Sequence, residues 1–230
     1  PILPGFHPDP SICRVGDDYY IATSSFEWFP GVPIHHSKDL VHWQLLTHAL
    51  DETRLLDMRG VPSSGGVWAP ALSYHEGLFY LSYTVVHQHE AATKDTPNFL
   101  TTAPTIEGPW SDPIHINSSG FDPSLFHAED GRKYWLNMVW DHRPERHPFH
   151  GIALQELDME TGKLLGKSEI IFKGSKIQLT EGPHLYQRNG YYYLLTAEGG
   201  TEYDHAVSLA RSRNLLGPYE VHPQNPVLTS

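Results

Sequence analysis

The sequence predicts an all-β fold of the β-propeller type, and three observations support this prediction. Helical periodicity is nearly absent along the 230 residues, whereas short aromatic runs with β-strand character recur throughout. A proline followed ten or eleven residues later by a tyrosine occurs four times, at Pro10, Pro70, Pro123 and Pro183. These prolines are 60, 53 and 60 residues apart, and a repeat of that length with several short strands is typical of propeller blades.

Each repeat also carries the signals of an inner hairpin and an outer strand pair. The inner strands are expected at 19–23, 78–86, 133–139 and 191–197. Each follows a turn signal, and Asp130-Gly131 and Asn189-Gly190 fit two-residue type I′ turns. A second turn that ends on an aromatic residue follows in three repeats, and residues 158–163 take its place in the third. Four blades are therefore expected, with a β-sandwich of chance internal similarity as the alternative.

Composition and charge limit the classes of function. A hydrophobic content of 39% is that of a globular chain rather than a disordered one. The net charge of −11 argues against nucleic acid or an anionic membrane as a partner and is compatible with a neutral substrate. No apolar run approaches the roughly 18 residues of a membrane span, and no signal peptide is visible. The single Cys13 excludes an internal disulfide, so we expect a cytoplasmic protein, although a leader could have been removed before Pro1.

Three carboxylates lie beside the repeated prolines. Asp9 and Asp122 each begin an Asp-Pro-Ser triplet. Because proline cannot donate to a sheet ladder, the triplet belongs at the start of a strand, which would place both acids at the mouth of the central channel. Glu181 lies two residues before Pro183, so the equivalent position is Gly182, where a bulge would redirect Glu181 inward. The alternative is that Asp9 and Asp122 only cap turns.

Such a group of acids points to glycoside hydrolysis. That reaction needs one protonated carboxyl for the leaving oxygen and a second carboxylate opposite it, and a third can raise the pKa of the acid. Trp68 and Phe121 offer aromatic faces on which a sugar ring can stack. The 16 histidines lack the spacing of a metal site, and no nucleophile elbow, phosphate loop or dinucleotide fingerprint is present. Cys13 is expected to be a small core residue.

Six motifs give the chain a family resemblance. They are PGFHPDPS from Pro4, MRGVP from Met58, GVWAP from Gly66, GFDPSLF from Gly120, TEGPH from Thr180 and TAEGG from Thr196. With these motifs the chain resembles the catalytic domain of the glycoside hydrolase family 43 β-xylosidases from Pro1 to Ser230.

The resemblance implies a five-bladed propeller that hydrolyses xylo-oligosaccharides from the non-reducing end with inversion. It implies that Asp9 is the general base, that Glu181 is the general acid, and that Asp122 modulates the pKa and orientation of the acid. The residues it assigns to the xylose pocket are Phe26, Trp68 and Phe121. No cofactor is expected and no metal ligand is assigned, although some relatives hold calcium in the central channel. Cleavage of α-L-arabinofuranosides would be a side activity, and the longer parent protein is expected to be a homo-oligomer.

The chain also departs from the family pattern. Family members carry a fifth blade, and many continue into a C-terminal β-sandwich; neither is found in the 230 residues. We therefore expect residues 1–230 to be an incomplete catalytic domain with about four of five blades, the alternative being a ring closed by four. Two other functions stay open: an arabinofuranosidase or arabinanase on the same scaffold, and a non-catalytic propeller that binds carbohydrate.

Overall fold

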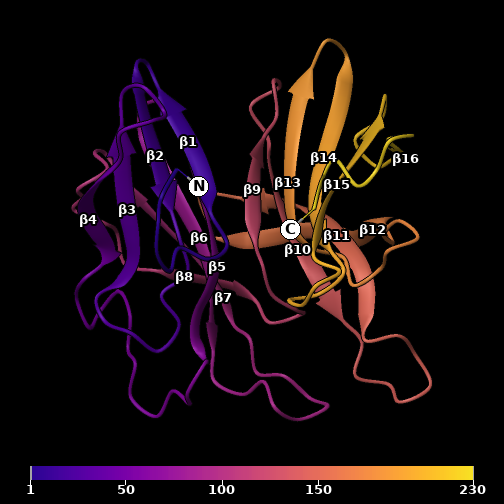
Figure 1. The fold of residues 1–230 in the computed structure, drawn as a ribbon, viewed down its shortest axis with the longest axis horizontal. Coiled ribbons are helices and arrows are strands. Elements are labelled where there is room, and N and C mark those ends of the chain that lie inside the picture. Colours follow the sequence, from indigo (N-terminus) through magenta and orange to yellow (C-terminus); the bar gives the residue numbers. More distant parts are fainter. Residues whose placement is uncertain (1, 230) are drawn as a thin grey trace. The chain divides into compact units, whose positions relative to one another are not determined.

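The computed structural model describes residues 2–229, and in that range the chain forms strands and loops but no α-helix (Figure 1). Pro1 and Ser230, the ends of the expected domain, lie outside the described residues. It follows that no helix in the described range could cross a membrane. The strands form four antiparallel sheets, and within each sheet the neighbours follow chain order.

The first two sheets come from the N-terminal half of the chain. Blade 1 contains β1 (Ser11–Val15), β2 (Asp18–Ala22), β3 (Gly31–Ser37) and β4 (Gln44–Leu50). Blade 2 contains β5 (Gly66–His75), β6 (Leu78–Val86), β7 (Asn98–Ala103) and β8 (Ile114–Asn117).

The other two sheets come from the C-terminal half. Blade 3 contains β9 (Ser124–His127), β10 (Lys133–Trp140), β11 (Phe149–Asp158) and β12 (Lys163–Phe172). Blade 4 contains β13 (Glu181–Arg188), β14 (Tyr191–Glu198), β15 (Ala206–Ser212) and β16 (Glu220–Val221), and β17 (Leu228–Thr229) also pairs with β15. The four blades predicted from the repeats are thus confirmed.

The predicted inner strands and most of their turns are also confirmed. The four expected runs coincide with β2, β6, β10 and β14 within two residues at each end. Asn189 and Gly190 both have positive φ, 51° and 72°, as a type I′ turn requires. The type I′ prediction for Asp130-Gly131 is wrong. β9 ends at His127 and β10 begins at Lys133, so five residues form this loop, and only Gly131 of the pair has positive φ.

The residue before each repeated proline has the same unusual backbone conformation. Asp9, Ala69, Asp122 and Gly182 have φ values of 52°, 23°, 56° and 55°. The ladder register shifts between Trp68 and Ala71 in β5 and between Glu181 and His184 in β13, which places a bulge near the start of the first strand of blades 2 and 4. The equivalence predicted for Asp9, Asp122 and Gly182 is confirmed, as is a bulge at Gly182, and Ala69 shares the same conformation.

Contacts divide the chain into two compact units, Pro1–Ser118 and Ser119–Ser230, each made of two blades. The core of the first unit includes Val32, Ile34 and Leu81, which are fully buried. Trp135 and Leu194 are buried to the same degree in the second unit. Apolar side chains from the inner and middle strands therefore fill the interior of each unit, as the alternating strand pattern requires.

Cys13 packs into the core of the first unit. It is 8% exposed, and burial raises the pKa of its thiol to about 11. A thiol with such a pKa carries almost no thiolate at neutral pH and is a poor nucleophile. The predicted role of Cys13 as a core residue is confirmed.

Candidate functional site

In the first unit, the carboxylate of Asp9 is held by a buried serine. The Ser24 hydroxyl donates to Asp9 Oδ2 at 2.5 Å and accepts the backbone N–H of Ala69 at 2.7 Å. Ser24 is 3% exposed, whereas Asp9 lies at the surface. One hydroxyl therefore fixes the orientation of an accessible carboxylate and links blade 1 to the left-handed position of blade 2. Asp9 does more than cap its own turn.

Phe26 follows Ser24 by two residues in the same unit. Its backbone forms an isolated bridge with Val67, with N–O distances of 3.0 and 2.9 Å. The bridge brings two chain segments very close together, since a Cβ added to Gly66 would lie 2.1 Å from the Phe26 carbonyl oxygen. Gly66 also has a φ of 79°, so only glycine fits at this crossing.

Trp68, next to this bridge, has its indole fixed by three contacts. Nε1 donates to the Ser64 carbonyl at 2.9 Å, the His89 ring lies 5.6 Å away between centroids, and Lys94 Nζ lies 6.0 Å from the ring centroid. Phe26 and Trp68 both remain partly exposed. The first unit therefore presents Asp9 and two held aromatic rings from neighbouring stretches of blades 1 and 2.

In the second unit, Asp122 and the Glu181 segment are brought together. The backbone N–H of Gly182 donates to Asp122 Oδ2 at 3.0 Å, and the Asp122 residue is 8% exposed. Ser124, from the same Asp-Pro-Ser triplet, donates its hydroxyl to the Pro183 carbonyl at 2.5 Å. The triplet of blade 3 thus forms hydrogen bonds to the backbone of Gly182 and of Pro183, the two residues that follow Glu181.

His184, just after this segment, adds no positive charge at neutral pH. Burial lowers the pKa of its imidazole to about 4. Its ring lies nearly parallel to that of Tyr186, with centroids 6.5 Å apart. The imidazole of His184 is therefore neutral at pH 7.

Phe121 belongs to an aromatic cluster of the second unit that the sequence analysis did not identify. Its ring centroid lies 6.2 Å from Trp140 and 6.2 Å from Phe149, which are themselves 5.3 Å apart. Phe121 is only 4% exposed, whereas Trp140 and Phe149 are partly exposed. A role for Phe121 in binding stays a prediction, and its two neighbours offer the accessible part of the cluster.

The two units use one pattern with a single difference. Asp122 accepts the amide of the left-handed residue in the next blade directly, whereas Asp9 reaches the corresponding amide through the Ser24 hydroxyl. Sequence reasoning missed Ser24, because its position in a Thr-Ser-Ser run looks like that of any turn serine. It also missed Glu198, a buried residue next to Ala197, which is the ladder partner of Glu181; Glu198 entered the sequence analysis only as part of the TAEGG motif.

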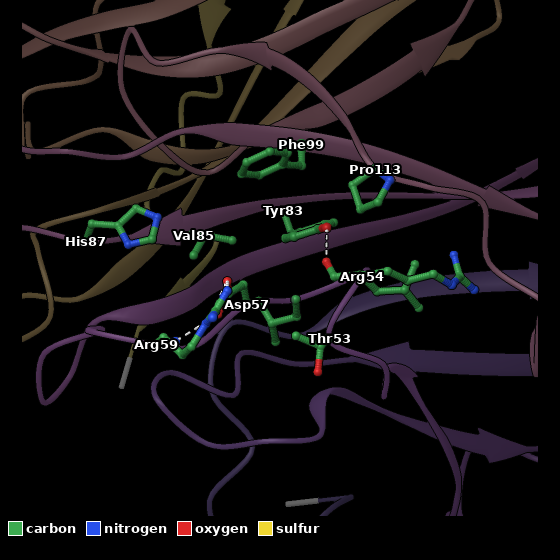
Figure 2. Close-up of a pocket in the computed structure, with 11 residues that line it drawn as sticks. Thr53, Arg54, Asp57, Arg59, Tyr83, Val85, His87, Phe99 and Pro113 are labelled. Carbon is green, nitrogen blue, oxygen red and sulfur yellow. Dashed lines mark hydrogen bonds and ion pairs between the residues drawn. The ribbon is translucent and has the colours of Figure 1, made fainter.

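A cavity of about 320 Å³ lies in the first unit, away from these residues (Figure 2). It is lined by the 53–59 connection and by side chains of β6 and β7. The Tyr83 hydroxyl donates to the Leu55 carbonyl, and Arg59 pairs with Asp57, which lowers the pKa of that carboxyl to about 2. No predicted site residue lines it.

Within residues 2–229, no group of three histidine, cysteine, aspartate or glutamate side chains is arranged to hold a metal ion. The histidines that pair with carboxylates do so singly, as His36 does with Asp18 at 2.6 Å.

Comparison with known proteins identifies relatives over the full chain. The profile of glycosyl hydrolases family 43 matches residues 1–230. Xylosidase/arabinosidase 43B of Humicola insolens is 63% identical and a β-xylosidase of Bacillus subtilis strain 168 is 62% identical, each over 230 residues. Each alignment covers the whole of this chain but only 43% of the related protein.

A solved structure agrees with this relationship. The crystal structure of xylan β-1,4-xylosidase from Bacillus halodurans C-125 matches with a TM-score of 0.98 and 65% sequence identity. The match covers 100% of this chain and 44% of the crystallised one. The blades described above are therefore the same fold as the corresponding part of that enzyme.

Proposed function

Because the chain belongs to glycosyl hydrolase family 43, we propose that it carries the acids of an exo-acting, inverting β-xylosidase. The proposal rests chiefly on one observation: the Asp122 carboxylate is bonded to the amide next to Glu181, which is the arrangement needed to orient a general acid. The names of the relatives, which are xylosidases of more than twice this length, support the substrate class.

In the proposed reaction, Asp9 accepts a proton from water as the water oxygen attacks the anomeric carbon of the terminal xylose. The glycosidic C–O bond breaks, and Glu181 gives its proton to the leaving oxygen. Asp122 keeps Glu181 oriented and favours its protonated form, since neighbouring carboxylates resist joint ionisation. The single displacement yields α-xylose. Such a mechanism requires about 6.5–9.5 Å between the Asp9 and Glu181 carboxyl groups.

Phe26, Trp68 and the Phe121 cluster would bind the terminal sugar through their rings. Xylo-oligosaccharides are the proposed substrates, with α-L-arabinofuranosides as a second class, because the Humicola insolens relative is named for both sugars. The single catalytic domain over residues 1–230, the homo-oligomeric parent and the cytoplasmic location stay predictions.

A proton NMR time course of xylobiose hydrolysis tests the proposal. With the full-length natural protein, the α-anomer of xylose should appear first and the β-anomer only later by mutarotation. Early β-xylose would rule out inversion. Glu181→Ala should lower turnover of xylobiose by about 100-fold or more, yet leave a dinitrophenyl xyloside much less affected, because that leaving group needs little protonation. The Asp9→Ala variant should lose turnover of both substrates.

A further inference from the structure

The carboxylate of Glu198 is fully buried and has no cationic partner. The residue ends β14 with 0% exposure, and among the described residues no lysine, arginine or histidine forms an ion pair with it. It follows Ala197, the residue paired with Glu181 across the β13–β14 ladder. Burying a carboxylate is costly unless hydrogen bonds compensate, so its partners need an explanation.

Four hydrogen bonds reach this carboxylate, and all come from two short segments. Thr180 donates its hydroxyl at 2.8 Å, Ser208 donates its hydroxyl at 2.6 Å, and Ser175 donates both its backbone N–H, at 2.6 Å, and its hydroxyl. An ionised carboxylate has about four acceptor positions, so these donors suffice to satisfy it. Two of the three donor residues, Ser175 and Thr180, lie in the stretch that leads into Glu181.

That stretch is strained and tightly wrapped around the carboxylate. Gln178 and Leu179 have φ values of 66° and 54°, which lie in the left-handed region that is strained for non-glycine residues. A Cβ added at Gly174 would lie 2.1 Å from Thr180 Oγ1 and 3.0 Å from Glu198 Oε1. Surrounding interactions must hold such a conformation, and the bonds to Glu198 are placed to do so.

We propose that Glu198 is a positioning residue for Glu181, acting through the Thr180 hydroxyl. The segment around Glu181 is then held from two sides: Thr180 is fixed by Glu198, and Gly182 is fixed by Asp122. This inference rests on the proposed function, since it assigns Glu198 to the orientation of the general acid. Glu198 itself does not touch substrate.

The sharpest test replaces Thr180 by valine, which removes the hydroxyl and keeps the shape. Thr196→Val is the matched control. Thr196 lies on the same strand as Glu198, is 2% exposed, and its hydroxyl has no hydrogen-bond partner. Both variants, with Glu198→Gln and Glu181→Ala, are assayed in the full-length natural protein on xylobiose and on a dinitrophenyl xyloside.

A displaced general acid matters most when the leaving group is poor. Thr180→Val and Glu198→Gln should lower kcat on xylobiose by roughly 10- to 100-fold and kcat on the dinitrophenyl xyloside by less than about 3-fold. Thr196→Val should leave both values unchanged. Glu181→Ala sets the scale, because it removes the acid altogether.

The outcomes separate the two proposals. If Glu181→Ala itself shows no dependence on the leaving group, the proposed function fails. Suppose that Glu181→Ala shows that dependence. If Thr180→Val then lowers kcat equally on both substrates, or on neither, the positioning role of Glu198 is overturned. The Thr180→Val result decides the question even if Glu198→Gln does not fold, since a single buried methyl replaces the hydroxyl.

Discussion

Removal of the Ser24 hydroxyl should lower the stability of the first unit and should also release the side chain of Asp9, the proposed general base. In Ser24→Ala the part-buried amide of Ala69 loses its acceptor, and Asp9 loses its donor. An unsatisfied buried donor costs about 1–3 kcal/mol, whereas the exposed Asp9 recovers most of its loss from water. The expected decrease in the free energy of unfolding is therefore about 2 kcal/mol.

The same substitution should lower turnover, because the Asp9 carboxylate becomes free to rotate away from the attacking water. Misplacement of a catalytic group by about 1 Å can cost about 100-fold, so a fall in kcat of roughly 10- to 100-fold is expected. Urea denaturation measures the first effect, and the initial rate on xylobiose measures the second in the full-length natural protein.

Ser25→Ala provides the matched control for Ser24→Ala. Its hydroxyl accepts the backbone N–H of Val32 at 3.2 Å and forms no bond to Asp9. It should cost about 1 kcal/mol of stability and leave kcat unchanged. If Ser24→Ala keeps the turnover of Ser25→Ala, then Ser24 does not orient the base and the reasoning from its two bonds is refuted.

Three further predictions follow from single contacts. Asp122→Asn keeps an acceptor for the Gly182 amide but removes a charge, so the alkaline limb of the kcat/KM profile should move to lower pH; an unmoved limb would contradict the proposed effect of Asp122 on the acid. The lowered pKa of His184 means that the unfolded chain binds the extra proton between pH 6.5 and 4, so stability is lost as the pH falls through that window. His184→Gln should remove about 2 kcal/mol of that acid-side loss in urea titrations at pH 7 and 4.5, and identical losses in both proteins would refute it. Tyr83→Phe leaves the Leu55 carbonyl without its donor and should cost about 1–2 kcal/mol in thermal or urea unfolding, with turnover unchanged.

The blades and the left-handed positions were predictable because both depend on local sequence. Because proline has no backbone N–H, the same position in each repeat cannot donate a hydrogen bond to the sheet ladder. The glycine-containing turns determine where the hairpin of each repeat reverses direction. Counting back from Pro183 places Gly182, rather than Glu181, in register with Asp9 and Asp122, and the φ values in the structure bear this out.

The supports of the acids were not predictable, because their partners are distant in sequence. Ser24 links residues 15 positions before and 45 positions after it, and Glu198 bonds to residues 18 and 23 positions before it. Neither residue belongs to a spacing pattern with a known chemical meaning. Only the folded arrangement of blades shows which hydroxyl meets which carboxylate.

The shared left-handed conformation before each repeated proline separates the backbone of a blade from its chemistry. Aspartate, alanine, aspartate and glycine occupy that position in the four blades with φ values that differ by 33° at most, from 23° to 56°. A blade can therefore acquire or lose an acid there by one substitution while its strands stay as they are. The fold provides four equivalent backbone positions, and the proposed chemistry depends on which of them carry an acidic residue.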